Sequence, residues 1–556
     1  MGMPAVHSVA ARSFTQSRSS LAYLACQFII LLLRAITPIA YLFISYLLVW
    51  GPSTLWIVSQ ESLPRTLIFA SLIAWMAAET LWFPYYLLTV KRLQRRNPAY
   101  HATSDPDTRR ALLVRCLDAL EAASPIKTRI NDMKRVIAGW FLGNISFDQI
   151  QRDNINSWVA WAFLDEDVDT LDSDKRAHVD DLVSLIEKRL DHVFPLGSNP
   201  AAKCIRLTLD PVQATHRPLV YYLATKCLNA IGTRLLHQLG FYYRTLDPMD
   251  VAGTGTLRYL YRPATEPTPL GATPIVFVHG IGIGFAAYLQ LLARLPRNVP
   301  IYLLEWPHVS MQLKEQVPTI PDTLSFLSGM LRRDKHPRAT FVAHSLGTVA
   351  VSWILKSPLH RNLVSSVVLL DPVTFLLCDP AIAYNFLYRP PTSVLELLMS
   401  YFVSREMYIA HSLSRHFHWS KNILFYDELP QPTLDGRGGR NAVLLAGHDA
   451  IVPSPRVKAY LDAQHSYTSD TLLDVLYYPT RHHGELLLRK SMLDPVMSKI
   501  LIACGSNPHV SFSHRRMSRR PAPFYRYKPA WKVVKLGGEK PRIMVVSARK
   551  GWGTPV

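Results

Sequence analysis

The sequence predicts an α/β protein in which a mainly parallel sheet, with helices on both faces, follows a membrane hairpin and a helical region. Two long apolar stretches near the N-terminus predict the hairpin. From Gly255 onward, short apolar runs alternate with segments of helical periodicity, which is the pattern of a parallel sheet. Within residues 339–353, a strand pattern turns directly into a helix pattern around Ser345.

The hairpin is predicted from residues 21–58 and about 66–90. Arg34 interrupts the first stretch, and its second half, residues 35–58, is long enough to cross a bilayer, which takes roughly 20 apolar residues. The second stretch holds one acid, Glu79, which we expect to face another helix or a protein partner rather than lipid. A pair of buried helices in a soluble protein is the alternative.

Basic residues flank the outer ends of both stretches, whereas the loop between them holds only Arg65 beside Glu61. This bias predicts an integral membrane protein with two spans, both chain ends and the catalytic domain facing the cytosol. A signal peptide is disfavoured because the apolar run is too long and lacks a cleavage site of small residues. The endoplasmic reticulum and lipid droplets are the organelles we would test first.

Five segments follow from these patterns: a cytosolic segment and apolar lead-in (1–34), the hairpin (35–90), a helical region (91–250), the α/β domain (251–504, with an insertion at about 373–426) and a basic tail (505–556). In the helical region, residues 218–240 are predicted to form one amphipathic helix with apolar residues at steps of four. We expect this row to pack on the α/β domain rather than on a membrane. Its members are Leu219, Leu223, Cys227, Ile231, Leu235 and Leu239.

The α/β domain is predicted to contain seven strands and three principal helices. The strands are expected at 256–261, 274–278, 300–304, 339–343, 363–370, 442–446 and 475–478, and the helices at 311–333, 346–353 and 484–503. The insertion at 373–426 is apolar and rich in Tyr and Phe, so we expect it to form a cap over a pocket.

The formal net charge is +20, and more than half of it lies in residues 507–556. This segment contains twelve Lys and Arg residues and only one acidic residue, Glu539. Such a tail suits an anionic membrane surface, and a merely solvated tail is the alternative. Nucleic-acid binding is disfavoured because no recognition module accompanies the charge. Six scattered cysteines without metal-ligand spacing predict reduced thiols, and neither a metal nor a cofactor is expected.

The junction at Ser345 has the pattern of a nucleophile elbow. Small residues, Ala343 and Gly347, stand two positions before and after the serine, where the strand and the helix must approach each other closely. A serine that only caps the helix is the alternative. As a nucleophile, Ser345 would need a base, an orienting acid and donors for the developing oxyanion.

Each of these partners has a candidate at the end of a predicted strand. The base is His483, with His482 as the alternative, and Gly484 lets the loop after His483 turn sharply. The acid is Asp449, in a Gly-His-Asp turn after the strand at 442–446, with Asp371 as the alternative.

The oxyanion donors are expected to be backbone amides. One is that of Leu346, which follows the serine, and the other is that of Ile281 or Gly282 in the glycine-rich loop after the strand at 274–278. This loop lacks the spacing of a dinucleotide site and the lysine of a phosphate-binding loop.

Four motifs therefore occur in order: His279-Gly280-Ile281-Gly282, Ala343-His344-Ser345-Leu346-Gly347, Gly447-His448-Asp449 and His483-Gly484-Glu485-Leu486. Over residues 256–503 the chain resembles the α/β-hydrolase superfamily, in particular its lipase- and esterase-like serine hydrolases. The resemblance implies a Ser345–His483–Asp449 triad and an oxyanion hole at Ile281 and Leu346. Ala343 departs from the usual glycine. The remaining segments look similar to uncharacterised fungal membrane-bound hydrolases of this superfamily.

The expected function is a membrane-anchored serine hydrolase that cleaves carboxylic esters through an acyl-enzyme. The apolar insertion beside a membrane anchor favours lipid acyl esters, with membrane lipids as partners and a lipid or small-molecule ester as substrate. An acyltransferase with the same triad and a non-catalytic scaffold are the alternatives. Epoxide and halide chemistry is disfavoured because the elbow carries Ser rather than Asp.

Overall fold

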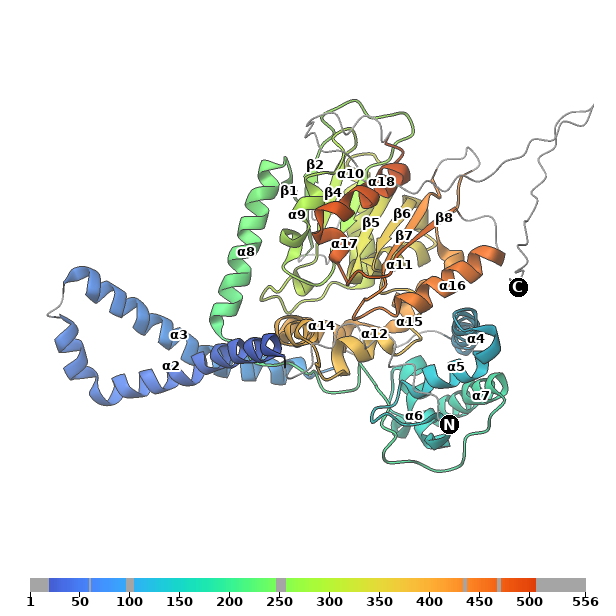
Figure 1. Cartoon of the computed structure of the whole chain (residues 1–556), viewed down its shortest axis with the longest axis horizontal. Coiled ribbons are helices and arrows are strands. Elements are labelled where there is room, and N and C mark those ends of the chain that lie inside the picture. The colour runs from blue at the N-terminus through green and yellow to red at the C-terminus, as the bar shows by residue number, and fades with distance from the viewer. Residues whose placement is uncertain are drawn as a thin grey trace, which may run out of the picture. The chain divides into compact units, whose positions relative to one another are not determined.

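The computed structural model describes residues 20–59, 62–96, 105–246, 257–433, 438–467 and 472–506 (Figure 1). All of these residues belong to one unit of the chain. Residues 507–556 of the predicted basic tail, the first 19 residues and Glu61 of the hairpin loop lie outside the described residues.

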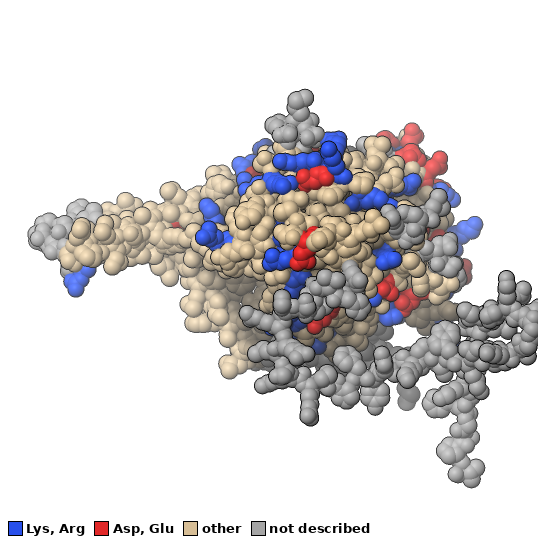
Figure 2. Space-filling view, turned by 90° about the horizontal axis from the view of Figure 1, so that it is seen from above, with Lys and Arg blue, Asp and Glu red and all other residues tan. Residues whose placement is uncertain are grey.

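Two long helices, α2 (Leu21–Ser59) and α3 (Leu63–Leu93), pack against each other. Both are long and apolar enough to cross a membrane, and only 17% and 11% of their most apolar windows are buried. Core helices of a soluble protein bury far more of their apolar surface than this. Figure 2 shows that most of the surface of this hairpin carries no charged side chain.

The first helix begins at Leu21 and continues through Arg34, so the span predicted at 35–58 is the second part of a longer helix. The Arg34 guanidinium lies over the Tyr401 ring, 5.4 Å from its centre, where the charge meets an aromatic face instead of lipid. Glu79 is buried and faces another helix as predicted. It accepts hydrogen bonds from the Thr37 hydroxyl (2.7 Å) and from the backbone amide of Leu219 (2.7 Å).

The sheet contains eight strands in the order β1-β2-β4-β3-β5-β6-β7-β8. β1 and β2 pair antiparallel with their neighbours, and β3 to β8 run parallel, which confirms the predicted fold class. The strands are β1 (Tyr242–Arg244), β2 (Arg258–Arg262), β3 (Ile275–Val278), β4 (Ile301–Glu305), β5 (Ala339–His344), β6 (Val364–Leu370), β7 (Asn441–Ala446) and β8 (Leu473–Tyr478).

Alternate residues of the central strands enter two separate hydrophobic cores, one on each face of the sheet. In β5, for example, Phe341 and Ala343 join one core, and Val342 joins the other. The first face is covered by α10 (Ile320–Arg333), α11 (Thr348–Lys356) and α16 (Ser454–Tyr467), and the second by α8 (Leu219–Gln238), α9 (Leu289–Leu292), α17 (Glu485–Leu488) and α18 (Leu493–Cys504).

The part of the helical region before α8 and the insertion both add their apolar side chains to the first core, and Figure 1 shows them beyond one end of the strands. The region contains α4 (Pro106–Ala122), α5 (Arg129–Ala138), α6 (Arg152–Val159) and α7 (Ser173–Leu190), and its apolar side chains are continuous with the core of the sheet. The insertion between β6 and β7 contains α12 (Ala381–Ala383), α13 (Val394–Met399), α14 (Met407–His416) and α15 (Trp419–Asn422). The limits of the domains remain predictions.

Three predicted elements differ from the structure. Strand β1 lies in the region predicted as helical, and its three residues are too few to show alternation. Helix α10 begins at Ile320 rather than 311, because Pro318 disfavours helix before it and the Thr319 hydroxyl caps the new start. The closing helix is broken into α17 and α18, because Pro495 in the first turn of α18 prevents a continuous helix through this point.

Helix α8 confirms the predicted helix at 218–240, but the predicted buried row was wrong. Leu223, Ile231 and Leu235 are 48%, 57% and 40% exposed, whereas Tyr222 and Leu236 are buried. The middle of the predicted row, from Leu223 to Leu235, does share one side of the helix, but this side is the exposed one. The helix does pack on the α/β domain, through a different face.

Candidate active site

Ser345 lies on a tight turn between β5 and α11. Its φ of 52° is in the left-handed region, which non-glycine residues rarely adopt. Gly347 permits this turn, because a Cβ there would lie 2.4 Å from the carbonyl oxygen of Val278. Ala343 is fully buried in β5, so the site holds a methyl group where the common pattern has glycine. The predicted elbow is therefore present in the backbone.

The structure brings together the three side chains predicted as nucleophile, base and acid. His483 Nε2 lies 2.9 Å from Ser345 Oγ, and His483 Nδ1 lies 2.6 Å from Asp449 Oδ2. The second carboxylate oxygen of Asp449 accepts the backbone amides of Ile451 (2.8 Å) and Val452 (2.9 Å). These bonds fix the carboxylate after β7 and aim the imidazole, which follows β8, at the serine.

Burial and the neighbouring carboxylates act in opposite directions on the pKa of the base. Burial alone would lower the pKa of His483, but the negative charge and hydrogen bond of Asp449, with the charge of Asp371, raise this pKa to about 9. The neighbouring His344 behaves in the opposite way. Its burial, together with the nearby His483, holds the pKa of His344 well below the usual value and keeps it neutral.

Asp371, the alternative acid, does not hydrogen bond to the His483 ring. Its two carboxylate oxygens accept the amides of Ala446 (2.8 Å) and Gly484 (2.8 Å), so it joins the end of β7 to the loop that carries the base. Burial, followed by the charge of Asp449, raises the pKa of Asp371 to about 7. Asp371 is thus placed as a positioning residue, and the prediction of it as the orienting acid is not supported.

His482, the alternative base, contacts the carbonyl oxygen of His448 through Nδ1 at 3.1 Å. The hydrogen bond to Ser345 comes from His483 instead. One ligand atom each of Asp371, Asp449 and His483 lies within 4.8 Å of the others, a spacing that can hold a metal. The hydrogen bonds described above already occupy the carboxylate oxygens and the ring nitrogens of this cluster.

Of the two backbone amides considered in the glycine-rich loop, the structure favours that of Ile281 as the second oxyanion donor. The Gly282 amide donates to the carbonyl of Val309 at 3.1 Å, so Gly282 as an oxyanion donor was wrong. Ile281 and Leu346 line the same cavity as Ser345. The Leu346 amide belongs to the first turn after the elbow, where amides have no carbonyl of a preceding turn to bond.

Buried polar side chains hold this loop against the elbow. His279 Nε2 accepts the amide of Trp306 (3.1 Å), so its Nδ1 carries the proton and donates to the Gly280 carbonyl (2.8 Å). The Tyr288 hydroxyl accepts the Gly280 amide (2.9 Å) and contacts His344 Nδ1 (2.8 Å). Residue 280 must be glycine, because a Cβ there would lie 2.9 Å from Ser345 Cβ.

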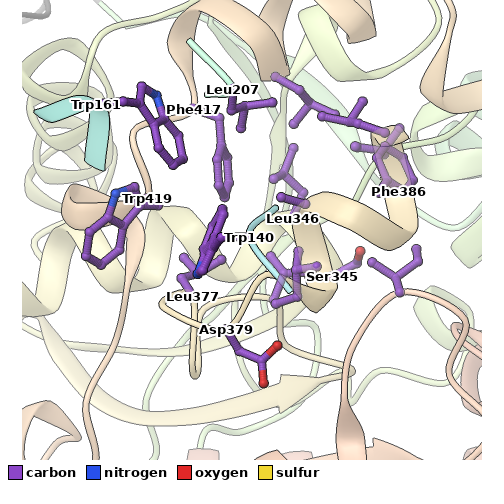
Figure 3. Close-up of a pocket in the computed structure, with 17 residues that line it drawn as sticks. Trp140, Trp161, Leu207, Ser345, Leu346, Leu377, Asp379, Phe386, Phe417 and Trp419 are labelled. Carbon is purple, nitrogen blue, oxygen red and sulfur yellow. The ribbon is translucent and has the colours of Figure 1, made fainter. Parts of the chain in front are cut away.

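Ser345 opens into an apolar cavity (Figure 3). The catalytic loops contribute Ile281, Ser345, Leu346 and Ile451, and the insertion contributes most of the remaining wall, including Phe386, Phe417 and Trp419. The insertion therefore lies where the sequence predicted a cap.

The helical region supplies the part of the wall that sequence reasoning missed. Trp140, Trp161 and Leu207 line the cavity, although their sequence positions lie far before the α/β domain. The aromatic-rich stretch at 140–163 was a signal, but nothing in its spacing distinguishes a cavity wall from an ordinary core. Figure 3 shows Trp140 and Phe417 near the middle of the site, and Trp161 and Trp419 at one end.

The polar atoms of the wall are satisfied by the protein. The indole N–H groups of Trp140, Trp161 and Trp419 donate to the Cys378 carbonyl (3.0 Å), the Thr208 hydroxyl (2.8 Å) and the Ala162 carbonyl (2.9 Å), respectively. The lining carboxylate, Asp379, pairs with Arg456 at 2.8 Å. A ligand in this cavity would therefore meet ring faces and methyl groups beyond the serine.

No family model and no curated protein matches the sequence. Among solved structures, the chain is similar to a membrane phospholipase A that is a bacterial virulence factor (13% identity, 51% of this chain and 93% of that chain, TM-score 0.33). It is also similar to a carboxylesterase from Bacillus subtilis (12% identity, 52% of this chain and 99% of that chain, TM-score 0.32). A third similar structure is a thermophilic esterase from Thermogutta terrifontis (12% identity, 48% of this chain and 99% of that chain, TM-score 0.34).

Because these identities and TM-scores are low, the assignment of the fold rests on the molecule itself. Six parallel strands follow two antiparallel ones, and a serine elbow follows β5. The acid and the histidine lie after β7 and β8, in the chain order Ser, Asp, His. Strand order, elbow and loops together give this chain the α/β-hydrolase fold.

Proposed function

We propose that the protein is a membrane-anchored serine hydrolase that cleaves carboxylic esters of long acyl chains through an acyl-enzyme. One observation carries the proposal: a continuous chain of hydrogen bonds runs from Asp449 through His483 to Ser345 Oγ, and this oxygen opens into an apolar cavity. The bonds account for an activated nucleophile, and the cavity accounts for an acyl chain.

In the proposed reaction, Ser345 Oγ attacks the ester carbonyl while His483 Nε2 takes the hydroxyl proton. The carbonyl oxygen becomes an oxyanion that the amides of Ile281 and Leu346 stabilise. The intermediate collapses, the bond to the leaving alcohol breaks, and His483 returns the proton to the alcohol oxygen. A water molecule then attacks the acyl-enzyme by the same proton transfers, which releases the carboxylic acid and restores Ser345.

Asp449 keeps the proton of the neutral imidazole on Nδ1, so that Nε2 is free to accept the proton of the serine. It also stabilises the imidazolium that forms during each half-reaction. The same interaction stabilises the protonated ring in the free enzyme, and the pKa of His483 is therefore raised.

Contacts between the cap and the hairpin support a lipid substrate. Helix α13 of the cap packs against α2, and the Tyr23 hydroxyl donates to the Pro391 carbonyl at 3.2 Å. A cap held against a membrane anchor would admit substrates from the bilayer. We place both chain ends and the catalytic unit on the cytosolic side, a topology that protease protection of a C-terminal tag would test.

The test is hydrolysis of p-nitrophenyl esters of increasing acyl length by the full chain in detergent or vesicles. We expect turnover to improve from acetate to long acyl chains and to disappear in Ser345→Ala. Turnover restricted to short esters would contradict the lipid substrate, and equal turnover by Ser345→Ala would contradict the nucleophile. Analysis of the products with an added alcohol separates hydrolysis from acyl transfer, because transfer yields a new ester.

A further inference from the structure

Helix α8 presents an apolar face that no other described residue covers. Its large side chains Leu223, Leu228, Ile231 and Leu235 are 40–57% exposed. The smaller residues between them, Ala224, Cys227 and Ala230, are exposed as well. The opposite face packs on the α/β domain, so the exposed apolar residues form a continuous surface on a rigid element.

The helix starts at the point where the hairpin leaves the rest of the unit. The amide of Leu219, the first residue of α8, donates to Glu79 of α3 (2.7 Å), and Trp82 Nε1 donates to the Arg217 carbonyl (2.8 Å). Beyond the Thr37–Glu79 hydrogen bond lie roughly 22 residues of α2 and 16 residues of α3, which at 1.5 Å per residue are about 33 Å and 24 Å. The hydrocarbon core of a bilayer is about 30 Å thick. If the hairpin spans a bilayer, α8 therefore starts at its surface.

The direction of α8 and the charges on it also agree with a position at the membrane surface. Figure 1 shows α8 running across the hairpin rather than along it, as a helix in the plane of a membrane would. The sequence of α8 contains no acid, and its two charged side chains, Lys226 and Arg234, are exposed and long enough to reach headgroups. Tyr242, just after the helix, is 59% exposed and suits the membrane interface.

We propose that α8 lies in the surface of the bilayer that α2 and α3 cross, with its apolar face among the lipids. This inference rests on the membrane anchor of the proposed function. Its consequence is that the bilayer orients the catalytic site. On its other face, α8 donates from Asn229 to the Ser310 carbonyl (3.2 Å), and Gly232 lies against Ala286 in the turn after the glycine-rich loop.

Cys227, on the exposed face, offers a natural labelling position. In a Cys26→Ser/Cys204→Ser background, the other cysteines are buried. The full chain would carry an NBD fluorophore at Cys227 in phosphatidylcholine vesicles that contain lipids with a nitroxide on the acyl chain. Two matched positions, each combined with Cys227→Ser, serve as controls: Leu48→Cys on the exposed surface of α2 and Ala459→Cys on the exposed side of α16.

We expect emission at 227 to be blue-shifted and quenched several-fold more than at 459, most strongly by shallow nitroxides, since an interfacial helix sits about 5–10 Å into the headgroup boundary. Ile231→Asp should reduce this quenching without lowering the midpoint of thermal unfolding, because the side chain is exposed.

Three results would overturn the inference. Quenching at position 48 but not at position 227 would show that the hairpin enters the membrane and that α8 does not. Absence of quenching at position 48 would contradict the proposed membrane anchor, and the placement of α8 at the membrane surface would then also be wrong. A blue shift at 227 without lipid quenching, together with cross-linking of Cys227 pairs, would show that a second copy covers the face. None of these results depends on esterase activity.

Discussion

The two ends of the cavity beside Ser345 are built in different ways. At the reacting end, Asp449, His483 and Ser345 are joined by hydrogen bonds of 2.6 and 2.9 Å. These residues come from loops at the carboxyl ends of parallel strands. At the far end, the wall consists of rings from the helical region and the cap, and each indole N–H bonds to the protein rather than to the cavity.

This difference predicts two kinds of sensitivity. Hydrogen bonds are directional, so the loss of one atom at the reacting end removes a proton path or an orientation. Contacts at the apolar end scale with buried area, so a change there alters affinity for the acyl chain by degrees. Substitutions at the two ends should therefore differ in size and also in which kinetic constant they change.

The largest effect is expected for Asp449→Asn. The amide would favour the wrong tautomer of His483, and kcat should fall by about 10⁴-fold with little change in KM. Steady-state kinetics on one ester measures both constants. Asp371→Asn is the matched control, because Asp371 holds loop amides and not the imidazole, and its effect on kcat should be much smaller. If Asp371→Asn were the more damaging variant, the orienting acid would have to be reassigned.

The pH profile should show the next largest effect. His483 must be neutral to accept the proton of Ser345, so activity is lost below its pKa and gained above it. With a pKa of about 9, kcat/KM should rise about tenfold per pH unit from pH 7 and level off near pH 9. Asp371→Asn removes a charge that raises this pKa, so it should move the profile to lower pH. If kcat/KM did not change with pH above pH 7, His483 would already be neutral at pH 7, and its pKa would not be raised.

Trp140→Ala should have a smaller and selective effect. The Trp140 indole lines both the cavity at Ser345 and a second, smaller apolar pocket in the helical region, a position that it shares with Trp419. Removal of the indole should open one pocket toward the other, so the ratio of kcat/KM for longer over shorter acyl esters should rise by about tenfold. Trp140→Phe keeps a ring in place and should leave the ratio nearly unchanged. An equal loss on all chain lengths would make Trp140 a structural residue only.

The smallest effect is expected for Ala343→Gly, which restores the common elbow pattern. Glycine in a strand costs about 0.5–1 kcal/mol of stability, and Ala343 is buried within β5 and does not line the cavity at Ser345, so kcat should not change. Thermal unfolding and kinetics on the same sample would measure both. A marked gain in kcat would show that alanine restrains the elbow.

Much of the reacting end could be predicted from the sequence because its signals are local. Ser345, His483 and Asp449 each stand at the end of a short apolar run, next to the small residues that a tight turn requires. The same reasoning failed for Gly282, whose amide bonds to the distant carbonyl of Val309. A residue pattern does not show which of two neighbouring amides a remote segment occupies.

The apolar end could not be predicted because its partners come together only in the folded chain. Trp140 and Trp161 are separated from Ser345 by much of the helical region and by strands β1 to β5, and a tryptophan in a cavity wall has the same local sequence signal as one in a core. Helix α8 failed for another reason. The apolar row at steps of four does mark one face of α8, but the pattern does not show whether such a face packs on the protein or stays exposed.

The central claim is that Ser345 is an activated nucleophile at the mouth of an acyl cavity. The most direct test is labelling of the membrane fraction with alkyl fluorophosphonates, with Ser345→Ala as the paired variant. We predict a covalent adduct on the peptide that contains Ser345, faster reaction of a long-chain probe than of a short-chain probe, and no adduct in Ser345→Ala. A folded wild-type protein that resists both probes in detergent and in lipid, or labelling that persists in Ser345→Ala, would contradict it.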